Sequence, residues 1–185
     1  MSRLIPLLLA LSSLLLGACA TTVVPDGLPD QAPPGAEARP EPEWLAMRAR
    51  LAAALSGPHG IDVQTMDDGA LLLRLPAAEG FARNSSEPTR ALRTMLDRVA
   101  TALREQPNTT INVLGHTDSI GSELYNLELS IRRAEAVMEY LRTRGIGLAR
   151  LRADGRGEAE PIAGNATATG RAVNRRIEIV VRPMD

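Results

Sequence analysis

Apolar positions recur along this chain with two different periods, which predict strands and helices in alternation. Two apolar-rich runs, residues 61–66 and 70–75, flank Asp67-Asp68-Gly69, a sequence that is typical of a β-hairpin turn. Beyond them, apolar residues return every three to four positions in two long segments. The pattern therefore predicts a hairpin followed by amphipathic helices.

The remaining elements follow from the same periods and from glycine and proline breaks. We expect a helix over residues 86–106, a strand over 109–114, a helix over 126–144, a strand over 148–153, a short helix over 169–174 and a strand over 176–182, with another short helix over 43–57 before the hairpin. Alternating strands and helices indicate an α/β (α+β) fold of βαβαβ type, with helices packed on a sheet. The final strand, added at the C-terminus after a crossover, makes that sheet mixed.

The helix predicted over residues 126–144 carries polar residues on its apolar side. Asn126, Ser130 and Arg133 are spaced i, i+4 and i+7 and fall in the middle of the apolar arc. Arg133 should point inward, and it then requires a charged or hydrogen-bonding partner because burial of a lone charge is costly. Asp118, which follows the strand predicted over 109–114, is the best candidate for that partner.

An acid and a base that converge at a strand end suit two different roles. Ligands in α/β folds tend to bind at the carboxyl ends of strands. There, the guanidinium of Arg133 can hold a carboxylate bidentately and the carboxylate of Asp118 can hold an ammonium, as a zwitterion would require. Alternatively, the two side chains neutralise each other as a buried structural pair. Their spacing in the sequence leaves both interpretations open.

Composition argues against several classes of function. The formal net charge is −1 and aromatic residues make up 2% of the chain, so a nucleic-acid-binding protein is not expected. With His59, His116 and one cysteine, a metal cluster is not expected either, and no cofactor motif is present. Glu158 and Glu160 are candidates for an acid and base of glycan cleavage, but loop carboxylates are usually solvated. A catalytic role therefore lacks support.

The N-terminus has the pattern of a targeting segment. Residues 1–18 combine Arg3 with an apolar run too short to span a bilayer, which is typical of a signal peptide. Leu16-Gly17-Ala18-Cys19 resembles a lipobox, in which Cys19 becomes lipidated; the alternative is an ordinary secretory signal with a chance cysteine. Residues 19–42 are proline-rich and predict an extended linker of up to about 60 Å, at about 3 Å per residue.

Three motifs from residue 61 onward resemble a known family. GHTDSIG (residues 115–121), NLELSIRRA (126–134) and NRRIEIVV (174–181) are similar to the T-D-x-x-G, N-x-x-L-S-x-x-R-A and N-R-R-x-E motifs of the OmpA-like C-terminal domain. That peptidoglycan-binding module occurs in outer-membrane protein A, peptidoglycan-associated lipoproteins and flagellar stator proteins. The resemblance covers about two thirds of the chain and implies an OmpA-like domain over residues 60–185.

The resemblance also implies roles for individual residues. In that family, the aspartate and arginine that correspond to Asp118 and Arg133 bind the amino and carboxyl groups of diaminopimelate in the peptidoglycan stem peptide. The residues expected to line the same pocket are Thr117, Asn126, Arg175 and Arg176. Residues 81–85, FARNS, match the family's F-D-x-x-S loosely and depart from it at the acidic position, where Ala82 stands.

The implied function is non-catalytic anchorage. We expect a lipoprotein that is anchored in the outer membrane of a Gram-negative bacterium, with its domain in the periplasm, and that tethers this membrane to peptidoglycan. Ala20, after the cysteine, resembles the pattern of lipoproteins sent to the outer membrane. The alternatives are a scaffolding lipoprotein that binds an envelope protein partner, and an enzyme that acts on the wall.

Overall fold

The computed structural model describes residues 42–58, 60–82 and 85–184, all within the unit Glu37–Asp185. The predicted signal peptide, Cys19 and all but the last residue of the predicted linker lie outside the described residues, so those expectations stay predictions. The elements are α1 (Pro42–Leu55), β1 (Asp62–Thr65), β2 (Leu71–Pro76), α2 (Arg90–Arg104), β3 (Thr109–His116), α3 (Glu123–Thr143), η1 (Leu148–Arg150), β4 (Leu151–Gly157), α4 (Ala168–Asn174) and β5 (Arg176–Pro183).

The five strands form one mixed sheet in the order β1-β2-β5-β3-β4. β3 and β4 are parallel, and the other neighbouring strands are antiparallel. The expected α+β class and mixed sheet are confirmed. The C-terminal strand takes a central position between β2 and β3, where it is hydrogen-bonded on both sides.

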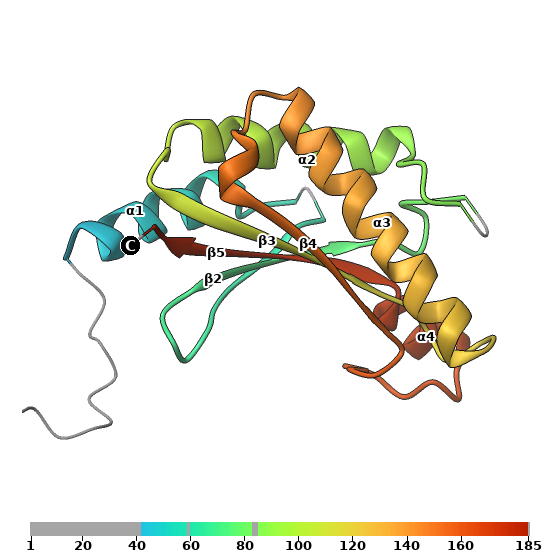
Figure 1. Cartoon of the computed structure of the whole chain (residues 1–185). Helices are drawn as coiled ribbons and strands as arrows, with labels where there is room; N and C mark the ends of the chain where they lie inside the picture. The colour runs from blue at the N-terminus through green and yellow to red at the C-terminus, as the bar shows by residue number, and fades with distance from the viewer. Residues whose placement is uncertain (1–41, 59, 83–84, 185) are drawn as a thin grey trace, which may run out of the picture. The chain divides into compact units, whose positions relative to one another are not determined.

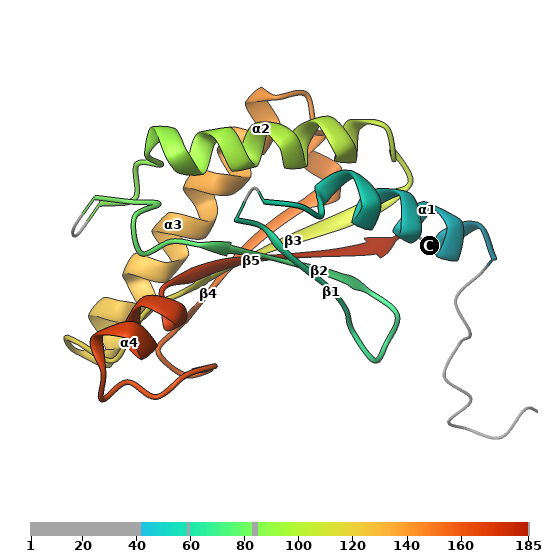
Figure 2. The ribbon, with the colours of Figure 1, turned by 180° about the vertical axis from the view of Figure 1, so that it is seen from behind.

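The three longest helices cover one face of this sheet (Figures 1 and 2). Alternate residues of the central strands point to that face, among them Leu73, Val113 and Ile179, and they share one core with α1, α2 and α3. A smaller apolar cluster of Ala70, Leu72, Leu114 and Val180 lies on the opposite face. No helix among the described residues has the length and apolar character needed to cross a membrane.

Helix α1 is part of the folded unit. Leu51 and Leu55 are each 1% exposed in the common core. At the other end of the helix, Trp44 Nε1 and Arg48 Nη1 donate hydrogen bonds to the carbonyl oxygen of Gly69, at 3.1 and 3.0 Å. The helix therefore packs on the domain and holds the turn of the β1–β2 hairpin.

Helix α3 approaches β3 and β4 unusually closely because both strands carry glycine at the crossing point. A Cβ at Gly115 would overlap the backbone of Ser130, and a Cβ at Gly155 would overlap Ser130 and Ile131. This close approach brings the first half of α3 to the end of β3, where the candidate site lies.

Gly115→Ala tests that approach. We expect it to lower the free energy of unfolding by about 1–3 kcal/mol, because the added methyl must displace helix backbone in a packed core. Gly147→Ala is the matched control, since a Cβ there meets nothing within 4 Å. Urea titrations of both variants provide the measurement, and equal midpoints would contradict the prediction.

Candidate functional site

A pocket of about 460 Å³ lies between the end of β3, the start of α3, the loop after β2 and the end of α4. Its charged and polar lining includes five of the six residues predicted from the motifs: Thr117, Asp118, Asn126, Arg133 and Arg175. The apolar part includes Phe81 and Leu129. Because two arginines and one aspartate line it, the formal charge of these three groups is +1.

Asp118 is fixed by its own loop and by one arginine. Its Oδ1 accepts a hydrogen bond from the backbone N–H of Ile120 at 3.0 Å, which closes a tight turn. Its Oδ2 lies 2.6 Å from Nη1 of Arg175. The expectation that Arg133 is the direct partner of Asp118 is therefore corrected, because Arg175 at the end of α4 takes that position.

Arg133 points inward, as the helical spacing predicts, and is 6% exposed. Its Nε donates to the carbonyl oxygen of Ser85 at 3.0 Å, and its guanidinium carbon lies 4.9 Å from the centroid of the Phe81 ring. Burial lowers the pKa of the Arg133 guanidinium below its ordinary value and the charge of Arg175 lowers it further, whereas Tyr125 and Asp118 raise it. No carboxylate among the described residues forms an ion pair with Arg133.

The other two inward polar residues of α3 hold the backbone of the site. The Nδ2 of Asn126 donates to the carbonyl oxygen of Asp118 at 3.2 Å and to Oε2 of Glu158 at 2.5 Å. Ser130 Oγ accepts from the N–H of Gly157 at 2.9 Å and donates to the carbonyl oxygen of Leu127 at 2.7 Å. Asn126 and Ser130 therefore connect α3 to the ends of β3 and β4.

Thr117 also belongs to the pocket, although its hydroxyl is buried. The backbone N–H of Thr117 donates to the carbonyl oxygen of Gly157 at 2.8 Å, which joins the ends of the two parallel strands. Its Oγ1 has no hydrogen-bond partner among the described residues. Its backbone thus contributes to the position of the next residue, Asp118.

Residues 80–175, more than half of the chain, match the OmpA family. This chain belongs to the OmpA family. The resemblance inferred from the three motifs is confirmed.

Two relatives and one solved structure show how far the similarity extends. The probable lipoprotein YiaD of Escherichia coli is 40% identical over 125 residues, which cover 68% of this chain and 57% of YiaD. The peptidoglycan-binding protein ArfA of Mycobacterium tuberculosis is 37% identical over 151 residues, which cover 82% of this chain and 40% of ArfA. The cell wall anchor of the T6SS from Pseudomonas aeruginosa has a TM-score of 0.65 at 34% identity, covering 74% of this chain and 99% of that structure. The chain thus spans less than two thirds of either full-length relative.

One residue of the predicted set lies away from the pocket of this OmpA-family domain. Arg176 is 4% exposed, and its Nε donates to Oε1 of Glu178 at 2.8 Å while its Nη2 donates to the carbonyl oxygen of Glu160 at 3.0 Å. The physical reason is that Arg175 caps α4 whereas Arg176 begins β5, so the side chains of the two neighbours diverge. The expectation that Arg176 lines the pocket is corrected.

His116 belongs to the same polar group as Arg176. It is 1% exposed, its Nε2 lies 3.6 Å from Oε2 of Glu178, and it is not among the pocket residues. Burial raises the pKa of Glu178, but the contacts with His116 and Arg176 outweigh that effect and lower it from 4.5 to about 2. Arg74 Nε, at 3.2 Å from Oε1, adds a further cation.

A depressed pKa makes Glu178 a source of acid-sensitive stability. Its contribution is complete above the unfolded pKa of 4.5 and is lost as the pH falls toward about 2. Between pH 5 and 2, we expect the wild-type unfolding free energy to fall by as much as about 3 kcal/mol more than that of Glu178→Gln. Denaturant titrations across this range provide the measurement, with Glu128→Gln, a side chain that is 56% exposed, as the control. Parallel pH profiles for wild type and Glu178→Gln would contradict the prediction.

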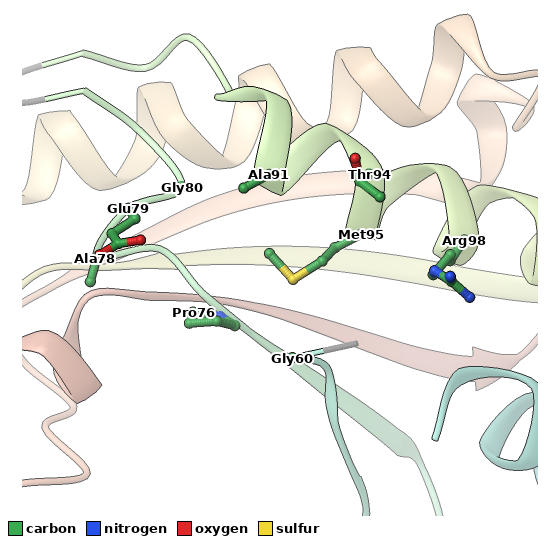
Figure 3. A pocket seen from close by; sticks show the side chains of 9 residues that line it. All are labelled: Gly60, Pro76, Ala78, Glu79, Gly80, Ala91, Thr94, Met95 and Arg98. Atoms are coloured by element: carbon green, nitrogen blue, oxygen red, sulfur yellow. The ribbon is translucent and has the colours of Figure 1, made fainter. Parts of the chain in front are cut away.

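A larger hollow, of about 530 Å³, lies between α2 and the end of β2. Figure 3 shows Met95 extending into the space beside Pro76, with Glu79 and Arg98 at opposite ends. None of the residues predicted from the motifs lines it, and its acid and base do not converge. The smaller pocket, where an acid and two bases meet, is therefore the candidate site of this OmpA-family domain.

Glu158 belongs to the site although its position in a loop did not indicate this. This residue looked like a solvated loop carboxylate, but it lies 2.5 Å from Asn126 Nδ2 and is only partly exposed. The signal that precedes it is Gly157, whose φ of 54° turns the chain toward α3. The loop over residues 81–85 lacks the acidic residue of the family motif. It contributes the Phe81 ring and the Ser85 carbonyl oxygen to the surroundings of Arg133 instead.

Proposed function

We propose that this chain is an outer-membrane lipoprotein whose pocket binds the diaminopimelate residue of a peptidoglycan stem peptide without cleaving it. Arg133 binds the carboxylate of that residue, and Asp118 binds its ammonium group. The chain then tethers the outer membrane to the cell wall.

The observation that carries the proposal is the environment of Arg133. Its guanidinium is buried at the wall of a pocket, stacked on Phe81, and has one backbone acceptor at 3.0 Å but no anionic partner among the described residues. A desolvated guanidinium without a counterion is costly, so an incoming carboxylate gains a charge-assisted and bidentate contact.

The rest of the pocket fits the other end of an amino acid. Asp118, with a side chain 11% exposed, supplies a carboxylate to an ammonium group, and the contact with Arg175 at 2.6 Å holds that carboxylate in position. A volume of about 460 Å³ suits a single amino-acid residue better than a folded partner. The relative ArfA is named a peptidoglycan-binding protein, which agrees with this ligand class.

The N-terminal pattern supplies the membrane end of the tether. Lipidation of Cys19 would hold the chain in the membrane, and the linker over residues 19–42 would extend up to about 60 Å toward the wall. YiaD carries the name of a probable lipoprotein, which agrees with such an anchor.

The test is retention on cell walls that differ in one carboxylate. Lysine is diaminopimelate without its second carboxylate, so the purified full-length chain in detergent should pellet with diaminopimelate-type sacculi and much less with lysine-type sacculi. Free meso-diaminopimelate should compete. Equal pelleting with both walls would contradict recognition by Arg133, and release of soluble muropeptides during incubation would favour an enzyme instead.

A further inference from the structure

The amide of Asn126 can have only one orientation in this pocket. Asn126 is 2% exposed, and one end of its amide lies between two acceptors, the carbonyl oxygen of Asp118 at 3.2 Å and Oε2 of Glu158 at 2.5 Å. Two acceptors require the NH₂ end, because an amide oxygen in that place would meet two other oxygens. The carbonyl oxygen Oδ1 is then the end left for a ligand, and no group among the described residues donates to it.

The backbone that precedes Glu158 is held in place by hydrogen bonds and directs this residue toward Asn126. The residue before it, Gly157, adopts a φ of 54°, and a side chain there would lie 3.1 Å from the backbone nitrogen of Leu127. The N–H of Gly157 donates to Ser130 Oγ at 2.9 Å and its carbonyl oxygen accepts from Thr117 N–H at 2.8 Å. The peptide groups on both sides of Gly157 are thus hydrogen-bonded, which restricts where the Glu158 side chain begins.

We propose that Glu158 is a positioning residue for recognition of the ligand's ammonium group. It holds the Asn126 amide with Oδ1 toward the pocket, where Oδ1 serves as a second acceptor beside the Asp118 carboxylate. This inference rests on the proposed function, since it assigns the groups that recognise the amine of the same ligand. An ammonium has three N–H donors, so one carboxylate oxygen and one amide oxygen are complementary to it.

Loss of the Glu158 carboxylate removes one of the two acceptors that fix the amide. The Asn126 amide then gains rotational freedom, and its NH₂ end can face an ammonium that it cannot bind. Arg133 is unaffected, so recognition of a carboxylate alone should not change. The quantity to measure is therefore the amine preference, which we define as the affinity for meso-diaminopimelate divided by the affinity for pimelate. Pimelate is the same dicarboxylate without the two amino groups.

Calorimetric titration of the full-length chain in detergent measures this ratio. In Glu158→Ala, we expect the preference to fall about tenfold, the loss typical of one hydrogen bond to a charged group. Glu158→Gln retains an acceptor oxygen without the charge and should stay near the wild-type preference. Asn126→Ala should match Glu158→Ala, and the double variant should be no worse than Asn126→Ala alone, because both changes remove the same contact.

Glu160→Ala is the matched control, a carboxylate in the same loop with a side chain 56% exposed, 3.7 Å from Arg156. It should leave the ratio unchanged. Wild-type preference in Glu158→Ala would overturn this inference alone, and an equal loss in Glu158→Gln would show that the charge acts directly, which also overturns positioning. A wild-type chain that shows no preference for the amine-bearing ligand would overturn the proposed function and this inference together.

Discussion

Arg133→Leu is expected to weaken binding of a diaminopimelate-containing tripeptide on the order of a hundredfold, because a buried cation that pairs with a ligand carboxylate contributes several kcal/mol. Leucine retains an apolar contact with Phe81 but cannot bind an anion. Fold stability should be unchanged or higher, since the wild-type chain carries the desolvation cost of an arginine that has no anionic partner among the described residues. Calorimetric titration and thermal melting of the same preparation measure both quantities.

This combination separates a binding arginine from a structural one. If Arg133 and Asp118 formed a buried structural pair, Arg133→Leu would leave Asp118 without a counterion and destabilise the fold. Asp118 instead has Arg175 at 2.6 Å, so its environment survives the substitution. Arg132→Leu is the control, because the Arg132 side chain is 46% exposed and lies 3.4 Å from Glu128 on the outer side of α3. Wild-type affinity in Arg133→Leu would contradict the proposed site.

The sequence was sufficient to predict the inward face of α3 because helical geometry is local. Asn126, Ser130 and Arg133 are spaced so that an ideal helix places them on one side, and all three are buried in the structure. The hairpin was predictable for the same reason, since Asp68 and Gly69 favour a turn whatever surrounds them. Asp68 Oδ1 accepts from the N–H of Ala70 at 3.0 Å, and Gly69 has a φ of 81°.

Some boundaries shifted where distant contacts decide them. The helix predicted from residue 86 begins at Arg90, with Thr89 as its N-cap, because Pro88 forms a β-bridge with Phe81 and so the preceding residues cannot be helical. The strand predicted over residues 148–153 begins at Leu151, where pairing with Ile111 starts, and the first three residues form the 3₁₀ turn η1. The local pattern of apolar residues does not show that Phe81 pairs with Pro88 or that Ile111 pairs with Leu151.

The pairing of charges within the site could not be derived from the sequence. Arg175 and Arg176 are adjacent and chemically identical. Because α4 ends and β5 begins between them, the Arg175 side chain contacts Asp118 and the Arg176 side chain contacts Glu178. Glu158 reaches Asn126 only because a register shift between Gly115 and His116 and the positive φ of Gly157 redirect the chain after β4. Such long-range geometry depends on how three strands and one helix pack together.

Asp118→Asn should change what the pocket prefers as well as how tightly it binds. We expect a loss of affinity for meso-diaminopimelate on the order of a hundredfold, because the carboxylate that holds the ammonium becomes a neutral amide. Affinity for pimelate should be retained or increased, since the formal charge of the three charged lining groups rises from +1 to +2 and Arg175 loses its partner at 2.6 Å. The amine preference of the pocket should therefore be lost.

Asparagine keeps the shape of the site, which makes this variant more informative than alanine. Its Oδ1 can still accept the N–H of Ile120 that closes the turn, at 3.0 Å in the wild type, so the loop should keep its conformation. Asp154→Asn is the control, because that carboxylate is 51% exposed and pairs with Arg156 at 3.5 Å, away from the pocket residues. Competition between meso-diaminopimelate and pimelate for each variant measures the preference. An Asp118→Asn variant that still favours the amine would place the ammonium site elsewhere in the pocket, because no interaction that depends on this carboxylate could then account for the selectivity.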